Sequence, residues 1–137
     1  MNKRMLFICL SLLVLVVLSA CGKLTNEAGV TVGVQSTSNR LVPTSDNFSS
    51  EVVDGRIILN INEMVQIDSK RDYSSQIEGN KIKIIAHVTP SNVKGMFPYV
   101  ARLTTKKLPK GDYSLEFFEE SRSSTEKIYE KKGLEIP

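Results

Sequence analysis

The stretch that decides the fold reads Leu108-Pro109-Lys110-Gly111-Asp112-Tyr113-Ser114-Leu115-Glu116-Phe117. Its first half contains a proline and a glycine. These residues favour a turn because proline fixes one backbone angle, whereas glycine accepts left-handed conformations. In its second half, Tyr113, Leu115 and Phe117 alternate with more polar residues, and side chains alternate between the two faces of a β-strand. The stretch therefore predicts a turn followed by a strand with one buried face.

This turn and strand resemble the corner before the penultimate strand of immunoglobulin-like and fibronectin type III-like domains. In those folds a leucine, a Pro/Gly turn and a tyrosine precede an alternating strand, and the tyrosine hydroxyl bonds back to the backbone. Tyr113 matches the position of that tyrosine, with Leu108 and the turn ahead of it. The resemblance implies that the Tyr113 hydroxyl locks the corner. The alternative is an ordinary turn that leads into an ordinary strand.

Further strand signals recur along the chain at intervals of roughly ten residues. Two hairpins are predicted where a two-residue turn separates apolar runs, at Asp54-Gly55 and at Gly79-Asn80. Other strands are predicted at 30–34, 99–106 and 127–136, with a Ser-, Thr- and Asn-rich loop at 35–50. Helices at 46–53 and 121–131 are disfavoured by their serine, tyrosine and isoleucine content. About seven short strands predict an all-β fold, an antiparallel β-sandwich of immunoglobulin-like type.

The first twenty residues have the layout of a secretory signal. A basic head with Lys3 and Arg4 precedes an apolar run over 5–18 and a small-residue end. A membrane-spanning helix is the alternative, but it needs about 20 apolar residues to cross roughly 30 Å of hydrocarbon. The run is shorter than that, and the chain turns polar at Gly22-Lys23. A cleaved signal is therefore the prediction.

The end of this signal, Leu18-Ser19-Ala20-Cys21, resembles the lipobox of bacterial lipoproteins. The resemblance implies cleavage after Ala20 and attachment of a diacylglyceryl group to the Cys21 thiol. Two acyl chains on one residue give stable anchoring, whereas one chain binds membranes only marginally. The predicted organisation is a signal peptide at 1–20, a lipidated N-terminus and polar tether at 21–28, and a β-sandwich domain at 29–137. A cysteine that follows an ordinary cleavage site by chance is the alternative.

The lipobox also implies a location in the bacterial cell envelope. The acyl chains of Cys21 would insert into membrane lipid, with palmitate as a typical chain. With one membrane, the domain would lie on the outer face of the cell membrane; with two membranes, the outer membrane is the expected site.

Composition narrows the partners and cofactors. Removal of the signal takes away Lys3 and Arg4, so the net charge falls from +3 to +1, and 117 of the 137 residues remain. A net charge this close to zero does not indicate a nucleic-acid-binding protein. Cys9 leaves with the signal and Cys21 would be alkylated, so the mature domain has no thiol for a disulfide or a metal. No cofactor and no metal is predicted.

The residues that could carry catalysis are few. His87 is the single histidine, and its parity places it on the polar face of a strand, where a solvated side chain is expected. Glu63 occupies an odd-numbered position of its strand, and the other odd-numbered positions are apolar, so a straight strand would bury it. Burial of an unpaired carboxylate is costly. A β-bulge near Asn62 that turns Glu63 outward is the favoured interpretation, and a functional acid is the alternative. The chain is accordingly predicted not to be an enzyme.

Candidate partner contacts are apolar residues outside the expected core. Met96 and Phe97 are predicted at the tip of a loop from Pro90 to Pro98, and Phe118 on an outer face. Ile58 and Ile85 also fall on faces predicted to be polar, where scattered exposed apolar residues are normal. The alternative is that Ile58, Ile85 and Phe118 converge on one outer face and form a binding patch.

Two functions follow from these expectations. The first is a membrane-anchored, non-enzymatic envelope lipoprotein that acts as a binding or assembly module with an envelope protein. The alternative is a lipoprotein inhibitor or immunity factor directed at an envelope or extracellular enzyme, which would present the loop that carries Met96 and Phe97.

Overall fold

The computed structural model describes residues 24–35 and 47–137, which form eight β-strands and no helix. The strands are β1 (Thr31–Gln35), β2 (Phe48–Val53), β3 (Arg56–Gln66), β4 (Lys70–Glu78), β5 (Lys81–Thr89), β6 (Met96–Thr104), β7 (Gly111–Glu120) and β8 (Thr125–Ile136). The predicted signal peptide at 1–20 and Cys21 lie outside the described residues, as does most of the predicted loop at 35–50.

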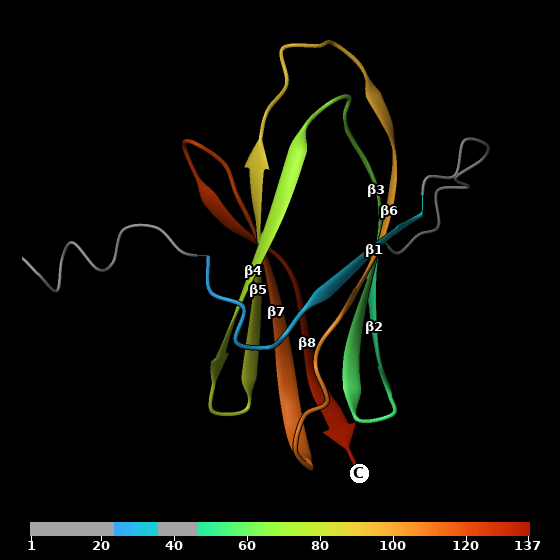
Figure 1. Ribbon diagram of the computed structural model, residues 1–137, viewed down its shortest axis with the longest axis vertical. Coiled ribbons are helices and arrows are strands. Elements are labelled where there is room, and N and C mark those ends of the chain that lie inside the picture. Colours follow the sequence, from blue (N-terminus) through green and yellow to red (C-terminus); the bar gives the residue numbers. More distant parts are fainter. Residues whose placement is uncertain (1–23, 36–46) are drawn as a thin grey trace, which may run out of the picture.

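Two four-stranded sheets face each other as a sandwich (Figure 1). The β1 sheet has the strand order β1-β6-β3-β2, and the β4 sheet has the order β4-β5-β7-β8. The all-β prediction is confirmed, with eight strands in place of about seven. One pairing departs from the antiparallel prediction, because β5 and β7 run parallel. The chain leaves the β4 sheet after β5, forms β6 in the other sheet, and returns to run beside β5 in the same direction.

Both predicted hairpins are present. Val53 pairs with Arg56 across Asp54 and Gly55, which have φ values of 51° and 73°. Two consecutive positive φ angles are typical of the tightest hairpin turn, whose twist matches that of the strands. Glu78 pairs with Lys81 across the second turn, in which Gly79 has a φ of 61°. The turn residues therefore set the register of β2 with β3 and of β4 with β5.

The predicted corner at the start of β7 is confirmed. The Tyr113 hydroxyl donates a hydrogen bond of 3.0 Å to the backbone carbonyl of Pro109. Tyr113, Leu115 and Phe117 are all buried on the inner face of the β4 sheet. A net contribution of about 1 kcal/mol is typical of one such hydrogen bond. It ties the connection after β6 to the strand that follows it.

The core lies between the sheets and takes residues from both. Its largest fully buried side chain is Phe117, whose ring centroid lies 5.7 Å from that of Phe48 on β2. Phe48 also stacks on Tyr129 of β8 at 5.9 Å, and the Tyr129 hydroxyl lies 2.8 Å from Ser50 Oγ. These contacts close one side of the sandwich, where β2 meets β8; we call it the β2–β8 side.

The N-terminal segment closes the opposite side, the β1–β4 side. Thr25 accepts a 2.9 Å hydrogen bond from the Ser75 amide, and the Glu27 amide donates to the Ser75 carbonyl at 3.1 Å. Ala28 is fully buried, and its amide donates to Ser75 Oγ at 3.0 Å. The segment then crosses to the β1 sheet, as Figure 1 shows in blue. Among the described residues, hydrogen bonds to the domain thus begin at Thr25, inside the 21–28 segment predicted to be a polar tether.

Strand β8 is a long edge strand with an irregular register. Tyr113 pairs with Leu134 and Leu115 with Lys131, so β8 has one extra residue there. Gly133 lies in this bulge with a φ of 70°, a backbone conformation that glycine adopts at little cost. The bulge twists the end of β8 and leaves a hollow beside it.

Candidate functional site

The predicted contact residues Met96 and Phe97 lie in a strand rather than at a loop tip. β6 begins at Met96, and the connection before it ends at Gly95. Pro98 does not break the strand. The Thr105 amide donates to the Ile57 carbonyl on β3, and the Gly95 carbonyl accepts from the amide of Ile67, just after β3. The backbone N–H and C=O groups of odd-numbered residues in β6 therefore point towards β3, whereas those of even-numbered residues such as Pro98 point away from it. Proline lacks an N–H, but at position 98 it removes no hydrogen bond to β3, so it is tolerated within β6.

The cross-strand register instead gathers exposed apolar residues on the outer face of the β1 sheet. Gln66 pairs with Met96, and Met64 pairs with Pro98. Met64 and Met96 are therefore diagonal neighbours on one face, and their side chains are 53% and 57% exposed. We call Met64 and Met96 the methionine patch. Val93, in the preceding connection, is exposed as well.

The connection that carries Val93 is fixed by side-chain hydrogen bonds. Gln66 Nε2 donates to the carbonyls of Ser91 at 2.8 Å and Val93 at 3.2 Å, while Gln66 Oε1 accepts the Ser91 amide at 3.2 Å. Gly95 has a φ of 128°, and a Cβ there would lie 2.8 Å from Ile67 Cδ1. A side chain at this position would require Ile67 to move and would strain the backbone, so glycine is favoured. The patch is therefore presented by a strand pair beside a connection that is bonded to it.

Phe97 and Phe118 are not part of this patch. Phe97 lies opposite Val65 on the inner face of the β1 sheet and is 39% exposed where the sandwich ends. Phe118 is on the other sheet, beside Ile85 on the outer face of the β4 sheet, with Lys83 Nζ 6.0 Å from its ring centroid. The three predicted contact residues thus occupy three separate surfaces.

Ile58 does not contribute to an outer-face patch, because it is only 4% exposed. It lies on β3 between Glu51 of β2 and Thr104 of β6. Glu51 forms a 3.8 Å ion pair with Arg102 of β6, which spans β3. The aliphatic stems of such long charged side chains cover apolar surface. Ile58 is therefore covered on its own sheet, and it does not join Ile85 and Phe118 in one patch.

An ionic cluster lies between the sheets beneath the methionine patch. β3 pairs with β6 in unbroken register from Ile58 to Gln66, so the predicted bulge near Asn62 is wrong and Glu63 points inward. Arg71 Nη1 on β4 lies 3.1 Å from Glu63 Oε1 and 3.3 Å from Glu119 Oε2 on β7. The Arg71 and Glu63 side chains are 9% and 16% exposed. One guanidinium thus links strands of both sheets and offsets the cost of the inward carboxylate.

The cluster has more acid than base, and its environment shifts two pKa values. Burial raises the pKa of the Glu63 carboxyl above 4.5; Arg71 opposes this shift and Glu119 adds to it. Burial and a hydrogen bond of 2.7 Å to the Tyr99 hydroxyl also raise the pKa of Tyr73. Among the described residues, Glu63 Oε1 and Arg71 Nε are buried atoms that make no hydrogen bond. The Glu63 contact with Arg71 is therefore an ion pair with unfavourable hydrogen-bond geometry.

His87 lies on the polar face of its strand, as predicted, and its side chain is 25% exposed. It also has partners on both neighbouring strands. Its Nε2 lies 2.7 Å from Ser74 Oγ on β4, and its Nδ1 lies 3.5 Å from Glu120 Oε2 on β7. A hydroxyl, an imidazole and a carboxylate in this order can activate a nucleophile. Ser74, however, is only 6% exposed, so its hydroxyl is closed to a substrate in this arrangement.

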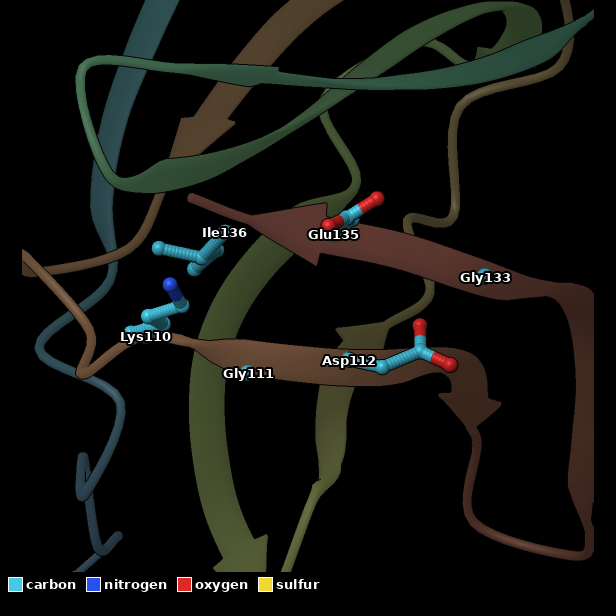
Figure 2. Close-up of a pocket in the computed structure, with 6 residues that line it drawn as sticks. All are labelled: Lys110, Gly111, Asp112, Gly133, Glu135 and Ile136. Carbon is cyan, nitrogen blue, oxygen red and sulfur yellow. The ribbon is translucent and has the colours of Figure 1, made fainter.

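An open hollow of about 450 Å³ lies at the far end of the sandwich from the methionine patch. Figure 2 shows Asp112 of β7 and Glu135 of β8 on the paired strands that line it, with Lys110 and Ile136 at one end. Asp112 and Glu135 are direct cross-strand partners. A second hollow of about 380 Å³ adjoins it and shares Asp112 and Gly133. The sequence signal for this feature was Gly133, since a glycine within a strand pattern indicates a bulge.

No family model, curated protein or solved structure matches this chain. In the ranges 24–35 and 47–137 there is no helix long and apolar enough to cross a membrane. The predicted lipidation residue Cys21 and its flanking Ala20 lie outside those ranges. Function must therefore be argued from the sequence of the N-terminus and from the surfaces of the domain.

Proposed function

We propose that this chain is a membrane-anchored bacterial envelope lipoprotein that acts as a non-enzymatic binding or assembly module. The observation that carries the proposal is the Leu18-Ser19-Ala20-Cys21 motif at the end of a signal-like run. A β-domain whose first hydrogen bonds are made by Thr25 follows it almost at once. Acylation of Cys21 would join that domain to membrane lipid.

The methionine patch is the surface that best suits a protein partner. Contiguous exposed apolar residues are uncommon on monomeric proteins and mark sites of association. Methionine adapts its flexible side chain to the shape of a partner. Here Met64 and Met96 are mounted on a regular strand pair, and Gln66 holds the neighbouring connection in place. Little backbone conformational entropy would then be lost on binding, which favours affinity.

The anchor is tested by comparing Cys21→Ala with Cys9→Ala. The two cysteines lie in the same N-terminal region, but only Cys21 is in the motif. Cells are grown with radiolabelled palmitate, and the protein is recovered from membrane and soluble fractions. We expect Cys9→Ala to keep the label and the membrane fraction, and Cys21→Ala to lose the label. Equal labelling of the two variants would contradict the anchor.

The binding surface is tested with a photo-cross-linking residue placed at Met96. The same residue at Val53, an exposed apolar position on β2 outside the patch, is the matched control. We expect one predominant cross-linked partner from position 96, in near-stoichiometric yield, and little from position 53. The same products from both positions would show that the methionine patch has no special role.

An inhibitor or immunity factor is the second candidate function. The observation in its favour is the connection over 90–95, which is fixed by Gln66 and followed by the exposed Met96 and Phe97. Inhibitors use such preorganised segments to limit the entropy lost on binding. Under this function, Phe97→Ala would relieve inhibition of an envelope or extracellular enzyme. A binding module that uses the methionine patch would keep its partner in the same variant.

A further inference from the structure

The point at which the chain joins the folded domain lies on the edge of β4. Thr25 and Glu27 bond to the backbone of Ser75, and Glu27 Oε2 accepts the Ile77 amide at 2.8 Å. β4 is an edge strand, so these contacts occupy the outermost backbone of the β4 sheet. Thr25, the first described residue that hydrogen-bonds to the sheet, therefore lies on the β1–β4 side.

The length of chain between this point and the anchor is short. Only Gly22, Lys23 and Leu24 separate Cys21 from Thr25. An extended chain spans at most about 3.5 Å per residue, so Thr25 lies within about 14 Å of the acylated cysteine. The four strands of the β4 sheet, at about 4.8 Å spacing, also extend across about 14 Å. The tether is thus no longer than the sheet is wide, and it restricts how the domain can turn on the membrane.

Exposed apolar residues lie close to the anchor on one side of the sandwich. Leu24 and Val32 are exposed on the β1–β4 side, among the exposed charged residues Glu27, Lys70, Asp72 and Glu78. The β2–β8 side includes β8, whose exposed positions are mostly charged: Glu126, Lys127, Glu130, Lys131, Lys132 and Glu135. An apolar side chain next to a lipid anchor gains from burial at the membrane interface, whereas charged side chains favour water.

We propose that the β1–β4 side of the sandwich docks onto the lipid bilayer, held there by a tether of three residues. The proposal rests on the lipid anchor proposed above and extends it to an orientation. Leu24 and Val32 face the interfacial region of the membrane, and β8 lies on the side away from it. The methionine patch is on the outer face of the β1 sheet, which remains open to a protein partner.

Site-specific fluorescence quenching tests this orientation. The acylated chain has no reactive thiol, because Cys9 leaves with the signal and Cys21 carries lipid, so one added cysteine can be labelled alone. Gln76→Cys on β4 and Lys131→Cys on β8 are matched sites, since they lie at nearly the same height on opposite edges of the β4 sheet. Each labelled lipoprotein is placed in phosphatidylcholine vesicles that contain a lipid with a nitroxide headgroup.

We expect at least twofold stronger quenching at position 76 than at position 131. An insertion of eight Gly/Ser residues after Lys23 should reduce quenching at 76 to the level of 131, because the maximum reach of the tether then increases about threefold, to about 42 Å. Equal quenching at the two sites in the uninserted protein would overturn the orientation. Unchanged quenching at 76 after the insertion would overturn the restraint by the tether.

The test separates this inference from the anchor itself. Flotation of the vesicles reports whether the protein is bound, and mass spectrometry reports whether Cys21 is acylated. Protein that floats and is acylated but shows equal quenching refutes the orientation alone. Protein that neither floats nor carries lipid refutes the anchor, and the orientation falls with it.

Discussion

Replacement of Arg71 by methionine should destabilise the domain by about 2 kcal/mol at pH 7. Removal of one partner from a buried ion pair typically costs about 3 to 5 kcal/mol. The lower end applies because Glu119, one of the two partners, is 32% exposed. The variant also removes the buried Arg71 Nε, which makes no hydrogen bond and costs about 1 kcal/mol in the native protein. Methionine keeps most of the apolar stem, so cavity formation contributes little.

The destabilisation caused by Arg71→Met should increase with pH, because Glu63 loses its proton as pH rises. Burial raises the pKa of folded Glu63 above its ordinary value of 4.5, so the protonated acid favours the folded state. Stability therefore declines as pH rises from about 4.5 through the folded pKa. Arg71 lowers this pKa, so its removal raises the pKa further and deepens the decline. We expect the effect of Arg71→Met to be small near pH 4 and largest near pH 8.

Urea unfolding followed by far-ultraviolet circular dichroism measures these effects, since the chain has no tryptophan. The control is Glu63→Gln, a neutral side chain of similar shape. In that background Arg71→Met should cost no more than about 1 kcal/mol and should vary little with pH, because the inward charge is gone. The reasoning is refuted if the cost of Arg71→Met is the same at pH 4 and pH 8, or the same with Glu63 and with glutamine.

Three further predictions concern single contacts. Tyr113→Phe should lower the unfolding free energy by about 1 kcal/mol, because the bond to the Pro109 carbonyl is lost; an unchanged urea midpoint would contradict this role. Gly133→Ala should cost about 1 kcal/mol through its positive φ. Gly33→Ala should be nearly neutral in the same thermal unfolding assay, because its Cβ would make only an ordinary contact with the Arg102 carbonyl oxygen at 3.8 Å. Met64→Ser should leave the unfolding temperature within about 2 °C of the native value, since an exposed side chain contributes little, yet it should abolish recovery of the partner that is cross-linked from position 96.

The features that the sequence predicts well are those that depend on neighbours along the chain. The alternation after Pro109, the turn at Asp54-Gly55 and the bond of Tyr113 all involve residues within a few positions of one another. Local backbone preferences and the two-residue period are enough to determine them. The parallel pairing of β5 with β7 is different. It arises because β6 joins the other sheet, and no local sequence pattern predicts which sheet a strand will join.

The errors at the candidate site have the same origin. The alternation of side chains along β3 correctly placed Glu63 on the inner face. The bulge was expected only because no partner for a buried carboxylate could be identified from the sequence. Arg71 supplies the compensating positive charge from a strand of the opposite sheet, and it also pairs with Glu119 on a third strand. Similarly, Ile58 is covered by an ion pair between two strands that flank its own. Such pairings are set by tertiary structure, so periodicity along one strand does not reveal them.

The early start of the folded segment has a practical consequence for any shortened form of this protein. A chain that began at Gly29, the boundary that periodicity favours, would lack the residues that bond to Ser75 and Ile77. The edge of β4 would then present unpaired amides and carbonyls to other chains, which is the usual route to edge-to-edge aggregation. Residues 25–28 act as a cover for that edge, and a soluble recombinant domain should begin before them.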